Sequence, residues 1–373
     1  GPLHVLLCNG QAAMVASVGP DGVLLVDTGY AGTATAVKEA LAGLSGAPVR
    51  LIVNTHGDGD HVGGNAQLGQ DAVVVAHPAT RSQMGRYFAL PLPDLEGLPG
   101  LTLESEATVH FNDDTIRLLP VPGAHTAGDL VVHFTGAGVA CLGDLVFTGG
   151  VPNADPARGG DARRLAEVLR TLEATLPEDT TLVPAHGDAI TMADLRDYIE
   201  MVEGTVAGVE GGVAAGENLE EMLRRPSLER WADWQPDREA FERWIGEVQA
   251  GVTGQGPRSI CAPMTEALVE ADIAAAVATY RRLKLEEPEA WSFAENELNT
   301  LGYQLLQRDR VEDAIAVFEL NTEAWPEAFN TWDSLGEALL AAGRRDEGIA
   351  SYRKSLELNP DNTNATTVLA ELE

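Results

Sequence analysis

The most informative segment of the chain is Asn54-Thr55-His56-Gly57-Asp58-Gly59-Asp60-His61. It follows directly on an apolar run of β-strand character, Val49 to Val53. Two imidazoles and two carboxylates within six consecutive residues can each bind a divalent metal. The glycines between them let the loop bend around an ion at low steric cost. The segment therefore predicts a metal-binding loop at the end of a strand.

Three further side chains that can bind a metal come later in the chain. Each follows a β-like apolar run and sits in a turn marked by glycine or proline. They lie in Gly123-Ala124-His125-Thr126, Leu142-Gly143-Asp144 and Pro184-Ala185-His186-Gly187. With the four donors of the first segment they supply enough ligands for two metal ions. The N-terminal two-thirds of the chain is therefore predicted to be a binuclear metallohydrolase.

Short apolar strands alternate with helical stretches over roughly the first 200 residues. Asp21-Gly22 predicts a tight hairpin turn, and Asp161 is expected to cap a helix that runs to Leu176. Strands are expected at residues 3–7, 12–18, 23–26, 49–53, 72–76, 115–119, 130–134, 139–142 and 181–183, and helices at residues 34–44 and 190–250. Two groups of strands with helices outside them predict an α/β fold, an αβ/βα sandwich. Residues 85–108 are rich in Pro and Gly, which indicates either a lid or an ordinary surface excursion.

The C-terminal region contains an internal repeat of 34 residues. Leu301-Gly302 recurs as Leu335-Gly336, and Phe318 aligns with Tyr352. The period and the positions of the small and aromatic residues resemble tetratricopeptide repeats. We expect three regions: a catalytic domain at residues 1–250, a linker and packing helix at residues 251–287, and an all-α repeat domain at residues 288–373. The repeats are expected to bind a protein partner or to mediate self-association.

Together the donors resemble the metallo-β-lactamase superfamily, whose signature is H-x-H-x-D-H followed by a distant His, an Asp and a final His. Asp27-Thr28-Gly29 also resembles the turn before the first helix of that superfamily. The resemblance covers roughly residues 1–250 and implies two packed sheets with the metals at one sheet edge. It also implies which residues hold each ion: His56, Asp58 and His125 the first, Asp60, His61 and His186 the second, and Asp144 as a bridge.

Asp58 departs from the commonest pattern, because it stands where the superfamily usually has its second histidine. The arrangement resembles the H-x-E-x-D-H motif of flavodiiron proteins. A carboxylate favours iron or manganese over zinc more than an imidazole does. Three carboxylates and a bridging hydroxide would still neutralise two divalent ions. We expect two divalent ions, with zinc first and iron or manganese as alternatives; the other interpretation is a single ion, with the site beside Asp58 weakened.

The resemblance implies hydrolysis by a metal-bound hydroxide, which Asp60 orients and whose proton it accepts. The expected substrate is a small-molecule ester, lactone or lactam, as for a lactonase or β-lactamase. Enzymes of the glyoxalase II type bind glutathione through cationic residues late in the chain, where this sequence offers only Arg224 and Arg225. Residues 147–160 are expected to line the mouth of the site, with Asn153 either touching substrate or only forming a turn. Two alternatives remain: a flavodiiron-like redox enzyme, or a repeat-mediated binding protein with a vestigial hydrolase domain.

The balance of charges limits the classes of partner. Lys plus Arg total 25 and Asp plus Glu total 57, which gives a formal net charge of −32. So acidic a chain is not expected to bind nucleic acid or an anionic membrane surface, because both require clustered cations. The three cysteines lie far apart, so no disulfide framework is expected, and no apolar run has the length of a membrane-spanning helix. The compartment stays open: periplasmic or secreted if a signal peptide has been removed, otherwise cytoplasmic.

Overall fold

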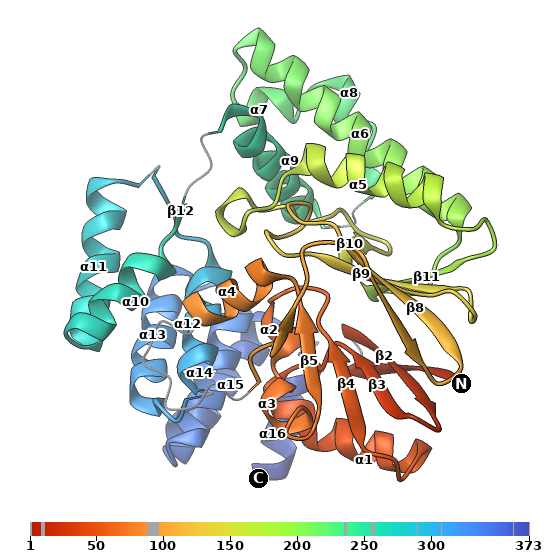
Figure 1. The fold of residues 1–373 in the computed structure, drawn as a ribbon. Coiled ribbons are helices and arrows are strands. Elements are labelled where there is room, and N and C mark those ends of the chain that lie inside the picture. The colour runs from red at the N-terminus through yellow and green to blue at the C-terminus, as the bar shows by residue number, and fades with distance from the viewer. Residues whose placement is uncertain are drawn as a thin grey trace. The chain divides into compact units, whose positions relative to one another are not determined.

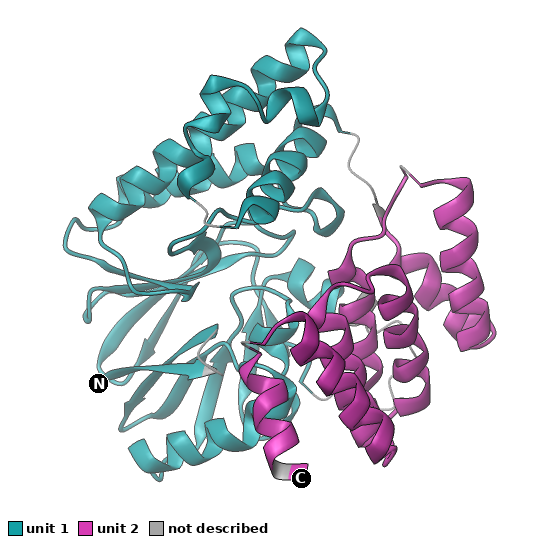
Figure 2. Cartoon of the chain, turned by 180° about the vertical axis from the view of Figure 1, so that it is seen from behind, with its two compact units in different colours: residues 1–85, 94–256 teal, residues 86–93, 257–373 magenta. Residues whose placement is uncertain are grey.

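The computed structural model describes residues 2–8, 12–87, 97–234, 237–254, 258–288, 290–306, 308–360 and 362–372. The chain divides into two compact units (Figure 2). The first comprises residues 1–85 and 94–256, and the second comprises residues 86–93 and 257–373. Each unit has an apolar core of its own. The first unit carries the predicted metal ligands, and the second carries the 34-residue repeat.

The first unit contains two β-sheets that share an apolar interface, with helices on their outer sides (Figure 1). One sheet has the strand order β1-β2-β3-β4-β5-β6, and its strands are Leu3–Cys8, Ala12–Gly19, Gly22–Val26, Val49–Val53, Val73–Ala76 and Leu101–Thr102. The other has the order β11-β10-β9-β8-β7, and its strands are Thr181–His186, Val139–Phe147, Leu130–Phe134, Asp114–Pro120 and Ala107–Phe111. The predicted αβ/βα sandwich is therefore confirmed.

The alternation of side chains along the strands explains the layers. Met14 of β2 points outward and packs in a cluster with α1 (Ala34–Leu44). Its neighbour Val15 points the other way and joins Val132 of β9 in the cluster between the two sheets. Successive side chains on a strand face opposite sides, so strands that are buried on both sides are almost wholly apolar. The compact apolar runs of the sequence are therefore central strands.

Three long helices cover the second sheet, and their apolar faces pack with β10 and β11. They are α5 (Ala162–Thr175), α6 (Met192–Ala215) and α9 (Arg238–Thr253). Asp161 caps α5 as predicted, because its side chain accepts hydrogen bonds from the backbone N–H groups of Arg163 and Arg164. Over the part of the chain that the structure describes, no helix has both the length and the apolar character needed to cross a membrane.

Short helices occupy several of the connections. They are η1 (Ala31–Thr33), α2 (Gly59–Val62), α3 (Asn65–Leu68), α4 (Pro78–Tyr87), η2 (Pro156–Arg158), α7 (Leu219–Met222), α8 (Pro226–Glu229) and η3 (Ala232–Trp234). The segment expected to be irregular, residues 85–108, instead begins in α4 and ends in β7, while residues 88–96 lie outside the described residues. Similarly, α9 continues to Thr253, past the expected start of the linker at residue 251, because Val252 still packs on the core of this unit.

The second unit is helical. Its elements are α10 (Cys261–Glu270), α11 (Ile273–Glu286), α12 (Glu295–Leu306), α13 (Val311–Ala324), α14 (Phe329–Ala341), α15 (Arg345–Leu358), α16 (Thr363–Leu372) and the two-residue strands β12 (Arg258–Ser259) and β13 (Trp291–Ser292). The repeat brings a glycine against an aromatic ring twice. A Cβ on Gly302 would lie 2.4 Å from Phe318 Cε1, and one on Gly336 would lie 2.8 Å from Tyr352 Cδ2. The small and aromatic positions recur together because each pair lets two helices approach closely.

Gly302→Ala is expected to destabilise the second unit by about 1–3 kcal/mol, because the added methyl group must displace the buried Phe318 ring. Thermal unfolding followed by circular dichroism should show a lower midpoint. Gly43→Ala is the control: Gly43 lies in α1 with open space around its Cβ position, and alanine is the better helix former. That control should unfold at the wild-type temperature or above, and equal midpoints for Gly302→Ala and wild type would contradict the close packing.

Candidate metal centre

All seven predicted ligands converge at one edge of the sandwich, where loops and strands of both sheets meet. They come from the loop after β4, from α2, from the β8–β9 loop, and from strands β10 and β11: His56 and Asp58, Asp60 and His61, His125, Asp144, and His186. The last two were expected in turns after their strands. However, β10 continues to Phe147 and β11 to His186, so Asp144 and His186 belong to the strands themselves.

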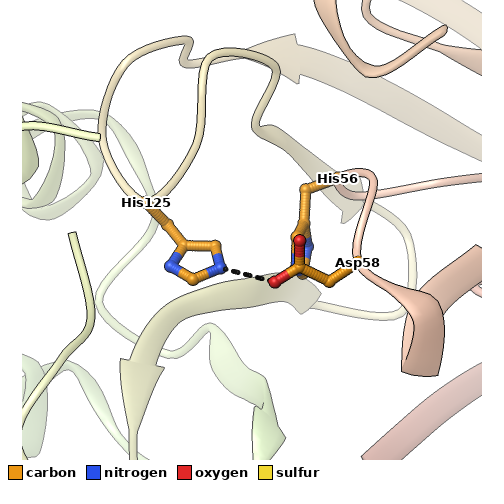
Figure 3. A group of neighbouring side chains, drawn as sticks. All are labelled: His56, Asp58 and His125. Atoms are coloured by element: carbon orange, nitrogen blue, oxygen red, sulfur yellow. Dashed lines mark ion pairs between the residues drawn. The ribbon is translucent and has the colours of Figure 1, made fainter. Parts of the chain in front are cut away.

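The first group of donors consists of His56, Asp58 and His125 (Figure 3). Asp58 Oδ2 lies 3.6 Å from His56 Nε2 and 3.5 Å from His125 Nε2. Both imidazoles are buried, whereas the Asp58 side chain is 20% exposed. Three donor atoms from two distant segments thus face one small space, which is the arrangement that a metal site requires.

The second group consists of Asp60, His61 and His186. Asp60 Oδ2 lies 3.3 Å from His186 Nε2 and 3.7 Å from His61 Nε2. His61 is buried, but the His186 side chain is 25% exposed. This group is therefore the more accessible of the two from the solvent.

Asp144 lies between the two groups. Its Oδ2 atom is 3.8 Å from His56 Nε2, 3.7 Å from His125 Nε2 and 3.4 Å from His186 Nε2. Its Oδ1 atom is 3.2 Å from His61 Nε2. Burial raises the pKa of Asp144, but the surrounding imidazoles, His61 foremost, hold it well below its usual range. One ionised carboxylate thus reaches histidines of both groups.

A β-bulge at Gly143 directs Asp144 into the centre. The pairing of β10 with β11 shifts register on both sides of Gly143, whose φ is +54°. A Cβ there would lie 2.8 Å from the side chain of Thr55. The position therefore requires glycine, and the bulge re-aims the next side chain.

Asp27, at the end of β3, orients two of the histidines. Its carboxylate accepts hydrogen bonds from His61 Nδ1 at 2.8 Å and from the backbone N–H and hydroxyl of Thr55 at 2.8 and 2.7 Å. Because the Thr55 hydroxyl gives its hydrogen to Asp27, it accepts one from His56 Nδ1, 3.1 Å away. Both rings therefore present an Nε2 lone pair to the centre. The sequence indicated only that Asp27 belongs to a turn.

His125 is oriented in the same way by two loops. Its Nδ1 atom donates to the backbone carbonyl of Asn153 at 2.7 Å. Asp129 ties the turn that carries it, accepting hydrogen bonds from the backbone N–H groups of Ala124, His125 and Thr126. Asn153 was expected either to touch substrate or only to form a turn, and in the structure its backbone carbonyl supports His125.

The donor set fits a divalent cation. Four of its buried atoms have no hydrogen-bond partner: His56 Nε2, His61 Nε2, His125 Nε2 and Asp144 Oδ1. Buried polar atoms are nearly always satisfied, so a cluster of such exceptions needs an explanation. Lone pairs from imidazoles and carboxylates that face one another are the donors with which proteins hold zinc, iron and manganese.

Arg158 and Gln83 contact Asp58. Arg158 lies in the segment expected to line the mouth of the site, whereas Gln83 was not expected there. Arg158 Nη1 forms an ion pair with Asp58 Oδ2, and Gln83 Nε2 donates to Asp58 Oδ1 at 3.4 Å. Burial raises the pKa of Asp58, but Arg158 and the hydrogen bonds from His125 and His56 hold it well below its usual range. Arg158 lies 100 residues after Asp58 in the chain, so only the tertiary structure reveals the pair.

Phe147 forms an aromatic surface beside the second group. Its ring is stacked on that of His186, with centroids 5.1 Å apart and planes within 2°. The backbone N–H of Phe147 donates to the Tyr198 hydroxyl at 3.2 Å, which fixes the end of β10. Burial lowers the pKa of His186, but the carboxylates of Asp144 and Asp60 raise it to about 10. An apolar ring therefore lies next to the most exposed imidazole of the centre.

Two family models match the chain. The model of the metallo-beta-lactamase superfamily matches residues 6–186, which include all seven donors. The model of the tetratricopeptide repeat matches residues 329–372, which include the second copy of the 34-residue repeat. Both resemblances found in the sequence are thus confirmed.

Relatives with curated descriptions include hydroxyacylglutathione hydrolases. The one from Gloeobacter violaceus is 36% identical over 162 residues, which cover 43% of this chain and 57% of that protein. The one from Anaeromyxobacter dehalogenans is 31% identical over 185 residues, which cover 49% of this chain and 60% of that protein. The chain thus spans somewhat less than two-thirds of the length of these curated relatives.

Among solved structures, the stereoselective inverting sec-alkylsulfatase Pisa1 from Pseudomonas sp. has a similar fold. The TM-score is 0.57 over 94% of this chain and 63% of that one, at 14% sequence identity. A likeness at so low an identity concerns the fold alone. The family models lead to one conclusion: residues 6–186 carry a metallo-beta-lactamase superfamily domain, and a helical region with a tetratricopeptide repeat follows it in the chain.

Proposed function

We propose that the chain is a metal-dependent hydrolase of small molecules. One observation carries this proposal: three buried imidazoles, each with Nδ1 committed to a protein acceptor, direct Nε2 toward the Asp144 carboxylate. Lone pairs that converge without a hydrogen-bond donor among them suit a cation. The likeness to proteins described as hydroxyacylglutathione hydrolases supports hydrolysis as the reaction.

Two divalent ions would be held by separate groups, with a shared carboxylate between them. The proposed ligands are His56, Asp58 and His125 for the first, Asp60, His61 and His186 for the second, and Asp144 for both. The clustering of these donor atoms within 4.8 Å of one another in each group supports this assignment. Zinc is the first ion to test because imidazole and carboxylate both bind it, and the three carboxylates keep iron and manganese as alternatives.

The chain's own groups would position water and substrate. Divalent ions bound here would supply an acidic water and polarise the carbonyl that is attacked. Asp60 would orient a water there and accept its proton, because its carboxylate lies beside His186 on the accessible side of the centre. Phe147, stacked on His186, gives the substrate an apolar surface on the same side.

A thioester is the first substrate class to test, because the acyl group of a hydroxyacylglutathione is attached to a thiol. Esters, lactones and lactams belong in the same panel. Arg224 and Arg225 offer little support for a glutathione site, since their guanidinium groups pair with Glu220 and Glu217. We therefore propose that the substrate is an acyl thioester or ester, and we assign no structure to its thiol or alcohol part.

Asp60→Ala and His125→Ala are each expected to lower kcat/KM at least about 100-fold on any substrate that the panel identifies, since each removes a proposed ligand and Asp60 also a proton acceptor. A chelator should abolish wild-type turnover, and added zinc should restore it. Asp71→Ala and His110→Ala are matched controls, because both residues are exposed and lie outside the centre. Near-wild-type turnover in either site variant at equal metal content would refute the mechanism.

Asp27→Asn is expected to weaken the second metal site about 10- to 100-fold, because an amide cannot replace the carboxylate that orients His61 and Thr55. Competition with a chromophoric chelator measures the dissociation constant directly. Because Asp27 is buried, its replacement can also disturb the fold, and circular dichroism is the control. The spectrum of the variant should match that of the wild type. Unchanged metal affinity in a folded variant would show that Asp27 has no role in the centre.

We also propose that the second unit, which contains the 34-residue repeat, binds either another protein or a second copy of the chain. The tetratricopeptide match at residues 329–372 supports a role in binding. Sedimentation of the full chain over a range of concentrations separates the two cases. A concentration-dependent dimer would support self-association, whereas a monomer throughout would favour a different partner.

A further inference from the structure

One oxygen of the Asp58 carboxylate has two roles. Its Oδ2 atom faces His56 Nε2 and His125 Nε2, at 3.6 and 3.5 Å, and so occupies the position of a ligand in the first group. The same oxygen accepts the ion pair from Arg158 Nη1. A guanidinium is always charged and keeps its charge when buried. A fixed positive charge therefore touches the oxygen that the first metal ion would bind.

Within the described part of the chain, no guanidinium or ammonium group pairs with Asp60 of the second group. Among the described residues, the ion-pair partners of Asp60 are the imidazoles of His61 and His186, which belong to the same group. With neutral imidazoles, the second group carries the full charge of Asp60. In the first group, by contrast, the charge of Asp58 is offset by that of Arg158. The two groups have matching donor types but different charges.

Arg158 is held in place by its own loop. Its Nη2 atom donates to Asn153 Oδ1 at 2.9 Å, and its backbone carbonyl accepts the N–H of Ala127 at 3.0 Å. Only 19% of its side chain is exposed. The Asn153 carbonyl that orients His125 belongs to the same loop, so the position of the guanidinium and that of the imidazole are coupled.

We propose that Arg158 makes the two metal sites unequal. Its charge lowers the metal affinity of the site formed by His56, Asp58 and His125. The two ions therefore bind in order, and this site is filled last. The proposal rests on the metal centre of the proposed function. The physical reason is repulsion between like charges in a partly buried space, where the effective dielectric is far below that of water. The Asp58–Arg158 pair is neutral overall, like the histidine that is usual at this position, so the carboxylate does not add net charge to the site.

The test uses the full chain, stripped of metal by a chelator and titrated with Zn²⁺ in competition with a chromophoric chelator. The wild type should take up two ions, with the second dissociation constant at least about tenfold higher than the first. His125→Ala should abolish the weaker step, which assigns that step to the first group. Arg158→Gln should tighten the weaker step by at least about tenfold, because glutamine keeps an amide donor for Asp58 but removes the charge.

Two arginine variants control for charge and for fold. Arg158→Lys keeps a positive charge near Asp58 and should bind both ions as the wild type does. Arg170→Gln makes the same change in net charge on the exposed face of α5, where Arg170 pairs with Glu173 and Glu203, and should leave both steps unchanged. An unchanged or weakened second step in folded Arg158→Gln would overturn the proposal and leave Arg158 only a role in orienting Asp58.

A second pair of variants tests the charge argument if Arg158→Gln folds poorly. Asp58→His removes the carboxylate that offsets the guanidinium beside the first group, while Asp155 stays 3.8 Å from Arg158 Nε, so the second step should weaken further. Adding Arg158→Gln to Asp58→His should restore it. Equal affinities in Asp58→His and the double variant would overturn the proposal. If the wild type binds both ions with equal affinity, only the proposed role of Arg158 is overturned. If the chain takes up no ion, the proposed metal centre is overturned as well.

Discussion

The main constraint on the first unit is that three carboxylates lie close together at one edge of its β-sandwich. Asp58, Asp60 and Asp144 point into one small space, and three buried histidines face them. Ionised groups so close together and largely buried are costly unless opposite charges offset them. The surrounding structure therefore has two tasks: it must hold the donors against their mutual repulsion, and it must leave their lone pairs free for a cation.

The first task falls to backbone features of the two sheets. The bulge at Gly143 turns Asp144 inward, and the glycine is required because a side chain would collide with Thr55. Asp27 adopts a left-handed backbone conformation, with φ of 60°, at the end of β3 and accepts three hydrogen bonds there. Because the central strands of both sheets are buried on two faces by apolar side chains, these strand ends are fixed in position. The packed sandwich thus holds the donor side chains in fixed positions.

The second task falls to groups outside the donor set. His56, His61 and His125 each give their Nδ1 hydrogen to an oxygen of the protein, so each keeps a lone pair on Nε2. The partners come from three different connections of the fold. The residue that contacts Asp58 differs from the partners of the histidines, because Arg158 supplies a positive charge as well as a hydrogen bond. Similar ligands can therefore form sites with different electrostatics, and the difference lies in residues that do not face the ion.

The sequence by itself determined the fold class, the seven donors and the 34-residue repeat. These are local patterns: buried strands are apolar runs, donor loops combine His and Asp with glycine, and a repeated helix pair repeats its small and aromatic residues. The tertiary structure alone decided which side chain contacts which donor. Asp27 meets His61 across 34 residues of chain, and Arg158 meets Asp58 across 100. Such pairs leave no local periodicity or spacing, because they arise only when separate loops are brought to the same edge by the packing of two sheets.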